Sequence, residues 1–286
     1  MAAITWSEMM SVGVPVLDAD HKTLVGLIND LHRSIGDEEE YATLGSVLKA
    51  LADYADYHFA REERVMEACR YPALSAHIVM HHKLARQVRD LKTRYDQDQT
   101  AVRAKDCLEF LHKWLIEHIC STDMDYRAWV IGHEGAENAA ESISMTGPRA
   151  AGSGLDWRSL RILVVDDNQN FCQVMRTILE GVGVRDIRNA HNLSTARSAL
   201  EAVTVDVVVT DWHVGVESGL DLVAWIRRQP ALAQLPVVML SGHERLANRD
   251  VALNAGADEF MEKPISARGL LMCLARLMTR PPREKA

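Results

Sequence analysis

Residues 57–82 read YHFAREERVMEACRYPALSAHIVMHH, and this stretch decides the fold of the first half of the chain. It holds two pairs of potential metal ligands, His58 with Glu62 and His77 with His81, and the members of each pair are four residues apart. Side chains at this spacing lie on one face of a helix, about one turn from each other. A proline between the two pairs fits the start of a new helix. The stretch therefore predicts two consecutive helices that each carry ligands on one face.

The same helical pattern extends over the first 133 residues. Apolar residues recur there at intervals of three and four, as in Leu24, Leu27, Ile28 and Leu31. This periodicity predicts four helices, over residues 18–35, 41–66, 73–96 and 101–131. Four long helices with short connections are typical of an all-α, up-down four-helix bundle.

The first and fourth predicted helices add three more potential ligands. His21 lies early in the first helix, and His118 and Asp123 lie in the fourth. The last two are five residues apart, so either a local bulge in the helix or the reach of the aspartate has to bring both inward. The whole set holds five imidazoles and two carboxylates. Imidazole suits first-row transition metals and carboxylates can bridge two of them, so the set predicts a site for two ions.

Such a set leaves the two ions with incomplete shells. A bridging oxo or hydroxo group and one vacant position would complete the six-fold coordination shells of the two ions. Dioxygen or another small molecule can bind at the vacant position. A ferritin-like diiron bundle is a rival interpretation, but it uses Glu-x-x-His on two helices. This chain has one such spacing, from Glu109 to His112, and a rotation of about 240° separates His112 from the face of His118.

Several short motifs in this half of the chain belong to one known family pattern. They are Val12–Val14, Asp18–His21, His58–Glu63, His77–His81 and Trp114–Ile119 followed by Asp123. On these motifs, residues 1–133 resemble a bacterial hemerythrin domain. The resemblance implies two non-haem iron ions with an oxo or hydroxo bridge, and reversible dioxygen binding.

The resemblance also implies which residues bind which iron. Three histidines belong to one iron, two histidines to the other, and two carboxylates bridge both. In that order the residues are His77, His81 and His118; His21 and His58; and Glu62 and Asp123. The iron with two histidines keeps the open position, where dioxygen or nitric oxide would bind.

From Leu160 onward, strands and helices alternate. Strands are predicted over residues 161–166, 185–189, 205–211, 236–241 and 257–262. Helices are predicted over residues 169–181, 193–203, 219–229, 245–255 and 266–279. This alternation predicts an α/β doubly wound, flavodoxin-like domain with a five-stranded parallel sheet. The expected organisation is a bundle at 1–133, a linker at 134–158 with some helix at its start, and a second domain at 159–282.

Acidic side chains lie at the ends of the predicted strands of the second domain. Asp166 and Asp167 follow the first strand, and Asp211 ends the third. Neighbouring strand ends are close in a doubly wound sheet, so these carboxylates should share a pocket and repel one another unless a cation is present. Mg²⁺ prefers such an oxygen site. Ser241 ends the fourth predicted strand and supplies a hydroxyl, and Lys263 follows the fifth and supplies an ammonium, which completes what an aspartyl phosphate needs.

On this set of residues, 160–279 resemble a response-regulator receiver domain. The resemblance implies that Asp211 is phosphorylated, with Ser241 and Lys263 assisting. Magnesium would be held directly by Asp167, by Asp211 and by the backbone carbonyl of His213, and by Asp166 mostly through water.

The resemblance also implies a switch residue and shows a departure from the family pattern. Ser241 and Phe260 would form the switch pair, although Phe260 is open to a second interpretation as a core aromatic. The loop after Asp211 departs from the family at Val214, Gly215 and Ser218, which affects loop stiffness and the lifetime of the phosphoryl group.

The composition of the chain excludes several classes of function. A net charge of −8 and a pI near 5.8 disfavour nucleic-acid binding. The first residues lack the basic start of a signal peptide, and no run approaches the ~18 apolar residues of a membrane span. Five scattered cysteines argue against a disulfide framework and fit a reducing cytoplasm.

Together the two halves predict a cytoplasmic two-component signalling protein that is not an enzyme. Its partners would be dioxygen or nitric oxide, a histidine kinase or phosphotransfer protein, and an unidentified downstream protein. Homodimerisation through the last two helices is left open. The alternative is an oxygen carrier or store that its receiver targets to a partner. An enzyme that turns over peroxide or nitric oxide ranks lowest, because no substrate channel is legible.

Overall fold

A computed structural model describes residues 2–36, 40–146, 155–242 and 246–280. The chain divides into two compact units, one built on Met1–Ser153 and the other on Gly154–Ile265 with Gly269–Ala286. Part of the linker predicted over 134–158, at 147–154, lies outside the described residues. The first position of the helix predicted over 245–255 and the predicted end of the second domain, at 281–282, also lie outside them. Within the described ranges, no helix is long and apolar enough to cross a membrane.

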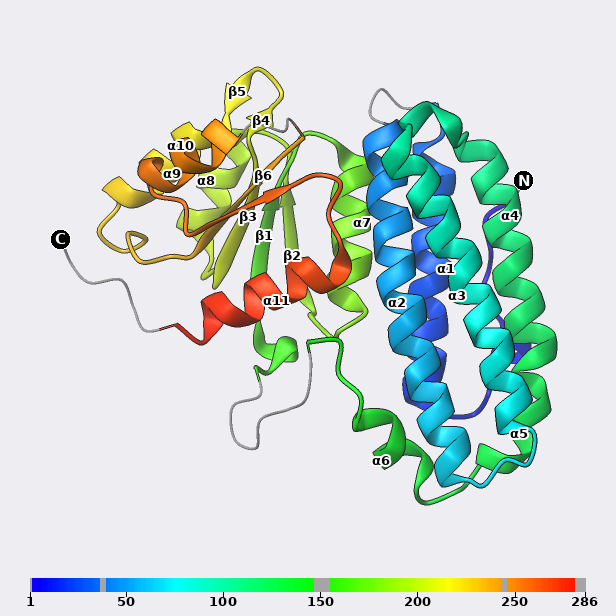
Figure 1. Ribbon diagram of the computed structural model, residues 1–286. Helices are drawn as coiled ribbons and strands as arrows, with labels where there is room; N and C mark the ends of the chain where they lie inside the picture. Colours follow the sequence, from blue (N-terminus) through cyan, green and yellow to red (C-terminus); the bar gives the residue numbers. More distant parts are fainter. Residues whose placement is uncertain (1, 37–39, 147–154, 243–245, 281–286) are drawn as a thin grey trace. The chain divides into compact units, whose positions relative to one another are not determined.

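The first unit is a bundle of four long helices, as predicted. They are α1 (Pro15–Ser34), α2 (Glu40–Ala68), α3 (Leu74–Gln97) and α4 (Ala104–Glu117), and they run side by side in Figure 1. The periodic apolar residues of α1, among them Leu24, Leu27 and Leu31, are fully buried. The helix α1 begins at Pro15, three residues before the predicted start, because a proline suits the first turn of a helix.

The fourth helix is not the single continuous α-helix predicted over 101–131. After α4 the chain forms one turn of π-helix, His118–Thr122, and then the short helix α5 (Met124–Val130). In this turn the backbone N–H of Asp123 donates to the carbonyl of His118 at 3.1 Å, five residues back instead of four. A π-turn thus contains one residue more than an α-turn.

A further short helix, α6 (Ala136–Glu141), lies at the start of the predicted linker. Its buried residues Ala136 and Ala140 belong to the same apolar cluster as Val65 and Met66 of α2. This part of the chain therefore packs as an element of the bundle.

The packing of α2 on α3 gives a stability prediction. A Cβ added to Gly45 would lie 2.6 Å from the ring of Tyr95, which is 2% exposed and whose hydroxyl donates to the carbonyl of Tyr41 at 2.7 Å. Alanine is favoured over glycine in a helix by about 1 kcal/mol, but overpacking a rigid core costs roughly 1–3 kcal/mol. We expect Gly45→Ala to destabilise the bundle in urea unfolding. Combining it with Tyr95→Leu should relieve the clash, and a stabilised single variant would contradict this packing.

The second unit is a five-stranded parallel sheet with the strand order β2-β1-β3-β6-β7. Its strands are β1 (Arg161–Val165), β2 (Asp186–Ala190), β3 (Val207–Asp211), β6 (Val237–Ser241) and β7 (Glu259–Glu262). The alternating helices are α7 (Gln169–Glu180), α8 (Leu193–Ala202), α9 (Gly219–Arg228), α10 (Leu246–Ala255) and α11 (Ala267–Met278), drawn around the sheet in Figure 1. This strand order confirms the predicted flavodoxin-like fold.

The loop after β3 contains a hairpin that the sequence reasoning did not predict. Strand β4 (His213–Val214) pairs antiparallel with β5 (Glu217–Ser218). Gly215 turns the chain between them with a φ of +62°, a conformation that glycine adopts without strain. The hairpin begins two residues after Asp211 and therefore borders the end of β3.

Candidate functional site

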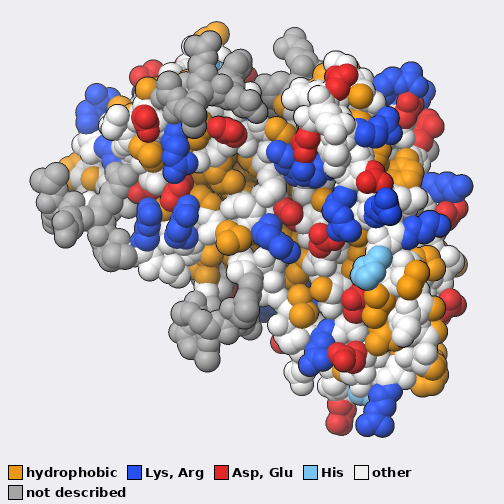
Figure 2. All heavy atoms as spheres, in the orientation of Figure 1, with side chains coloured by type: hydrophobic (Ala, Val, Ile, Leu, Met, Phe, Trp, Pro, Cys, Tyr) orange, Lys and Arg blue, Asp and Glu red, His pale blue; other side chains and the backbone are white. Residues whose placement is uncertain are grey.

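All seven predicted iron ligands are buried inside the helical unit. The side chains come from α1 (His21), α2 (His58 and Glu62), α3 (His77 and His81), the π-turn (His118) and the residue after it (Asp123). Their ligand atoms form two groups that share Glu62, and within each group the atoms lie within 4.8 Å of one another. On the face of this unit drawn in Figure 2, histidine makes up little of the surface, in keeping with this burial.

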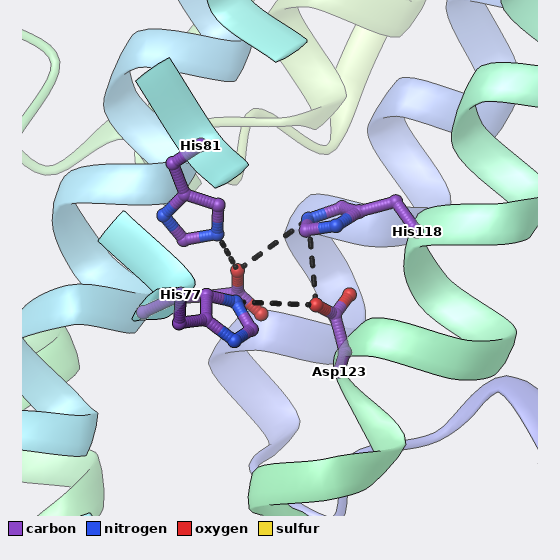
Figure 3. A group of neighbouring side chains, drawn as sticks. His77, His81, His118 and Asp123 are labelled. Carbon is purple, nitrogen blue, oxygen red and sulfur yellow. Dashed lines mark ion pairs between the residues drawn. The ribbon is translucent and has the colours of Figure 1, made fainter. Parts of the chain in front are cut away.

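Asp123 contacts histidines of both predicted irons. Its Oδ2 lies 3.3 Å from the Nε2 of His21, and its Oδ1 lies 3.4 Å from the Nε2 of His118 and 3.6 Å from that of His77. Figure 3 shows His77 and His81 of α3, His118 of the π-turn and Asp123 pointing toward one another.

Glu62, like Asp123, contacts histidines of both predicted irons. Its Oε2 lies 3.1 Å from the Nε2 of His81 and 3.4 Å from the Nε2 of His58. Its Oε1 lies 3.7 Å from the Nε2 of His21. Both carboxylates therefore touch both groups of histidines, which is the arrangement that bridging two ions requires.

The π-turn explains how His118 and Asp123 share one face despite their five-residue spacing. One extra residue per turn lets the pair five apart occupy the positions that residues four apart occupy in an α-helix. Of the two routes left open by the sequence, the local bulge is the one observed.

This geometry predicts opposite results for two deletions at Cys120 and Ser121, the exposed residues of the π-turn. Deleting Cys120 should leave a regular α-helix with the ligands four apart, so this variant should take up as much iron as the native chain. Deleting both Cys120 and Ser121 should rotate Asp123 away by about 100° and remove the iron. Iron content per chain measures both results. Loss of iron from the single deletion would show that the π-turn itself is needed.

Burial and neighbouring charges lower the pKa of some groups in the cluster and raise the pKa of others. Burial lowers the pKa of His77 to about 4. Burial also opposes protonation of His81, but hydrogen bonding to Glu62 and Glu63 outweighs it and raises the pKa of His81 to about 9. The pKa of Asp123 is raised well above its usual value by burial and by the charge of Glu62.

The cluster fits metal ions because its polar atoms have few other partners. Among the described residues, both ring nitrogens of His21, His58 and His118 and both carboxylate oxygens of Asp123 are buried without a hydrogen-bond partner. Such atoms are costly to bury unless they are hydrogen-bonded or coordinate a metal. Five imidazoles and two carboxylates are a suitable donor set for two first-row transition-metal ions.

Two residues near the cluster were missed by the sequence reasoning. The hydroxyl of Tyr126 donates a short hydrogen bond to the Oε1 of Glu62, and both side chains are fully buried. The Nδ1 of His81 lies 2.8 Å from the Oε1 of Glu63. Outer partners of this kind orient metal ligands. The signal for Tyr126 was available, since it follows Asp123 by three residues on the same helical face.

The second unit contains an acidic pocket at the carboxyl ends of β1 and β3. Oxygens of Asp166, Asp167 and Asp211 lie within 4.8 Å of one another. The Nζ of Lys263 lies 2.7 Å from Asp166 Oδ2 and 3.2 Å from Asp211 Oδ2. The parallel strands bring these residues together because β1 and β3 are neighbours in the sheet.

The remaining predicted residues of this pocket lie beside it. Ser241 is buried at the end of β6, and its carbonyl accepts a hydrogen bond from the N–H of Lys263 at 2.7 Å. His213 begins the β4–β5 hairpin with an exposed side chain. Phe260 on β7 belongs to the apolar core, and its ring centroid lies 6.4 Å from that of Trp212. In this structure Phe260 therefore has the surroundings of a core aromatic.

The pocket gives a prediction for the pH dependence of magnesium binding. Burial raises the pKa of Asp166 to about 7, with Lys263 opposing the rise and Asp211 adding to it. Below this pKa the carboxyl is protonated and neutral, so the affinity for Mg²⁺ should fall by up to about tenfold per pH unit. Magnesium titrations at pH 8 and pH 6, followed by the tryptophan fluorescence of the chain, would measure this affinity. Asp166→Asn should remove the dependence, and equal affinities in the native chain would contradict it.

Comparison with known proteins matches each half of the chain separately. The model of the hemerythrin HHE cation binding domain matches residues 12–130, and that of the response regulator receiver domain matches residues 162–275. The bacteriohemerythrin of Stenotrophomonas maltophilia is 29% identical over 133 residues, which are 46% of this chain and 85% of that protein. The bacteriohemerythrin of Pseudomonas aeruginosa is 32% identical over 126 residues, 44% of this chain and 80% of that protein. The solved receiver domain of NtrX from Brucella abortus is 32% identical, covering 41% of this chain and 97% of that one with a TM-score of 0.38.

A four-helix bundle followed by a flavodoxin-like sheet defines a chain with two domains of different fold class. The chain belongs to the hemerythrin family through its first half, and its second half matches the model of the response regulator receiver domain. It is thus a hemerythrin–receiver signalling protein, and both family predictions are confirmed. The hemerythrin family carries a non-haem diiron centre, in accord with the buried histidine and carboxylate cluster.

Proposed function

We propose that the protein senses dioxygen, nitric oxide or redox state at a diiron site and passes this signal through a receiver that a histidine kinase or phosphotransfer protein phosphorylates on Asp211. The observation that supports the sensing half is the buried cluster whose two carboxylates touch both groups of histidines. The domains that carry the two activities are residues 1–133 and 159–282, with 134–158 between them. The proposal includes no enzymatic turnover.

In this proposal the seven buried ligands hold two irons. The histidine triple His77, His81 and His118 would hold one iron, and the pair His21 and His58 would hold the other. Glu62 and Asp123 would be shared by both ions, and Tyr126 holds the Glu62 carboxylate in place through its hydrogen bond. When bound, the diiron centre supplies a redox-active site with an open position for a small ligand. The apolar bundle around the cluster excludes bulk water from that position.

The receiver acts through its acidic pocket. Asp166, Asp167, Asp211 and the carbonyl of His213 would hold Mg²⁺, and when bound this ion would supply positive charge beside the incoming phosphoryl group. The carboxylate of Asp211 attacks the phosphorus, the bond to the donor's leaving group breaks, and the leaving group departs with its electron pair. Lys263 contacts the new phosphoryl oxygens, and Ser241 and Phe260 form the switch pair that responds to them.

The proposal predicts that the state of the diiron site changes the chemistry at Asp211. Two sites that are coupled influence each other in binding free energy. The test compares phosphorylation by acetyl phosphate, and the lifetime of the phosphoryl group, in reduced, oxygenated and metal-free full-length chain. A difference between the three states supports sensing. Equal kinetics would overturn it and favour an oxygen carrier or store that the receiver targets to a partner.

A further inference from the structure

A buried ion pair lies directly behind His58, on the side of the ring away from the cluster. The Nη1 of Arg61 donates to both carboxylate oxygens of Asp20, at 2.9 and 3.1 Å. Asp20 Oδ2 lies 3.6 Å from the Nδ1 of His58, and that nitrogen is among the buried atoms without a hydrogen-bond partner in the described chain. The Nε2 of the same ring faces Glu62 within the cluster.

The surroundings of this pair distinguish it from an ordinary surface ion pair. The Asp20 side chain is 2% exposed and that of Arg61 is 13% exposed. The guanidinium also lies over the ring of Tyr57, 4.3 Å from its centroid, and its Nη2 reaches the carbonyl of Ile143 after α6 at 3.4 Å. Each of these contacts fixes the guanidinium and, through it, the Asp20 carboxylate.

A second aspartate–arginine pair, between Asp56 of α2 and Arg89 of α3, gives an internal comparison. Asp56 accepts from the Nη1 of Arg89 at 2.7 Å, but these side chains are 45% and 49% exposed. Asp56 precedes His58 by two residues, so the two pairs flank the same stretch of helix. Water screens the exposed pair, whereas the charge of the buried pair acts on His58 with little screening.

We propose that Asp20 and Arg61 are positioning residues that set the donor strength of His58. The Asp20 carboxylate places a negative charge beside the Nδ1 of His58, which strengthens the Nε2 of the same ring as a ligand. The Arg61 guanidinium holds that carboxylate in place and offsets its negative charge. A carboxylate behind a ligating histidine raises the basicity of the ligand and fixes its ring. The inference rests on the proposed diiron site, and it concerns the iron with the open position.

The two members of the pair should shift the midpoint potential of the diiron centre in opposite directions. Removing the negative charge with Asp20→Asn disfavours the more positive, oxidised state and should raise the potential. Removing the positive charge with Arg61→Gln leaves the carboxylate uncompensated and should lower it. Loss of the carboxylate should also weaken iron retention by about ten- to a hundredfold.

The experiment uses the full-length chain reconstituted with ferrous iron under anaerobic conditions. Midpoint potentials are read by spectroelectrochemistry, and iron retention by competition with a chelator. Asp56→Asn and Arg89→Gln serve as matched controls and should behave like the native chain in both measurements. Opposite shifts in Asp20→Asn and Arg61→Gln support the proposal, because mere loosening of the fold would move both variants the same way.

Two further results would count against it in different ways. Shifts of the same sign, or values equal to those of the controls, would overturn the role of Asp20 and Arg61 while leaving the diiron site intact. A native chain that takes up no iron after reconstitution would overturn the proposed diiron site, and this inference with it.

Discussion

Glu62→Ala should abolish iron binding by the full-length chain. The Glu62 carboxylate lies within 3.8 Å of imidazole nitrogens from His58, His81 and His118, and it belongs to both groups of potential ligands. In the proposed diiron site, Glu62→Ala would remove a ligand from each iron at once. The affinity should therefore fall by more than the roughly tenfold to hundredfold that loss of an outer partner costs.

Glu62→Ala should also lower the stability of the metal-free protein. The hydroxyl of Tyr126 loses its buried acceptor, which costs about 1–3 kcal/mol of stability in the metal-free protein. Iron analysis and the visible spectrum measure the first effect, and urea unfolding of the metal-free chain measures the second. Glu67→Ala is the matched control, since Glu67 lies on the same helix with a side chain that is 61% exposed. A Glu62→Ala chain that retained its native complement of iron would exclude bridging by this residue.

Asp211→Asn should abolish phosphorylation by acetyl phosphate while leaving the iron spectrum unchanged. Among the three clustered aspartates, Asp211 ends β3 and faces the ammonium of Lys263 at 3.2 Å. An amide is a poor nucleophile, and it cannot form the acyl phosphate that a carboxylate forms. The expected loss is complete within the sensitivity of the assay.

The control for this variant comes from the same unit. Asp221→Asn changes an exposed aspartate in the first turn of α9 and should leave phosphorylation at the native rate. Acid-labile phosphate and the mass of the intact chain both report the modification. Persistent labelling of Asp211→Asn would place the phosphoacceptor elsewhere, and simultaneous loss of iron would show that the two activities are not separable by domain.

Much of the fold could be predicted because its signals are local and repeated. The apolar period of the bundle and the buried runs of the sheet are set by residues that each element needs for its own core. The ligands share this property, since His58 with Glu62 and His77 with His81 follow the helical period. These patterns predict that the seven residues bind iron, and the proposed experiments test that prediction.

The features that were predicted only in part, or not at all, depend on tertiary contacts. Some helix was expected at the start of the linker, but the six residues of α6 are too few for a periodic signal, and its packing on α2 through Ala136 and Ala140 was not predicted. The β4–β5 hairpin has two residues per strand, so no alternation marks it. The π-turn was hidden because apolar residues continue on both sides of it. Its one visible sign was the five-residue spacing of His118 and Asp123.

The π-turn also affects how related chains should be aligned. A helix that gains one residue as a π-turn keeps the residues on either side of it in their original register. Chains with His-x₃-Asp and chains with His-x₄-Asp at this place can therefore build the same site. An alignment that forbids a gap between His118 and Asp123 would shift every position downstream of the gap, including Tyr126, and would misread a conserved ligand set as a divergent one.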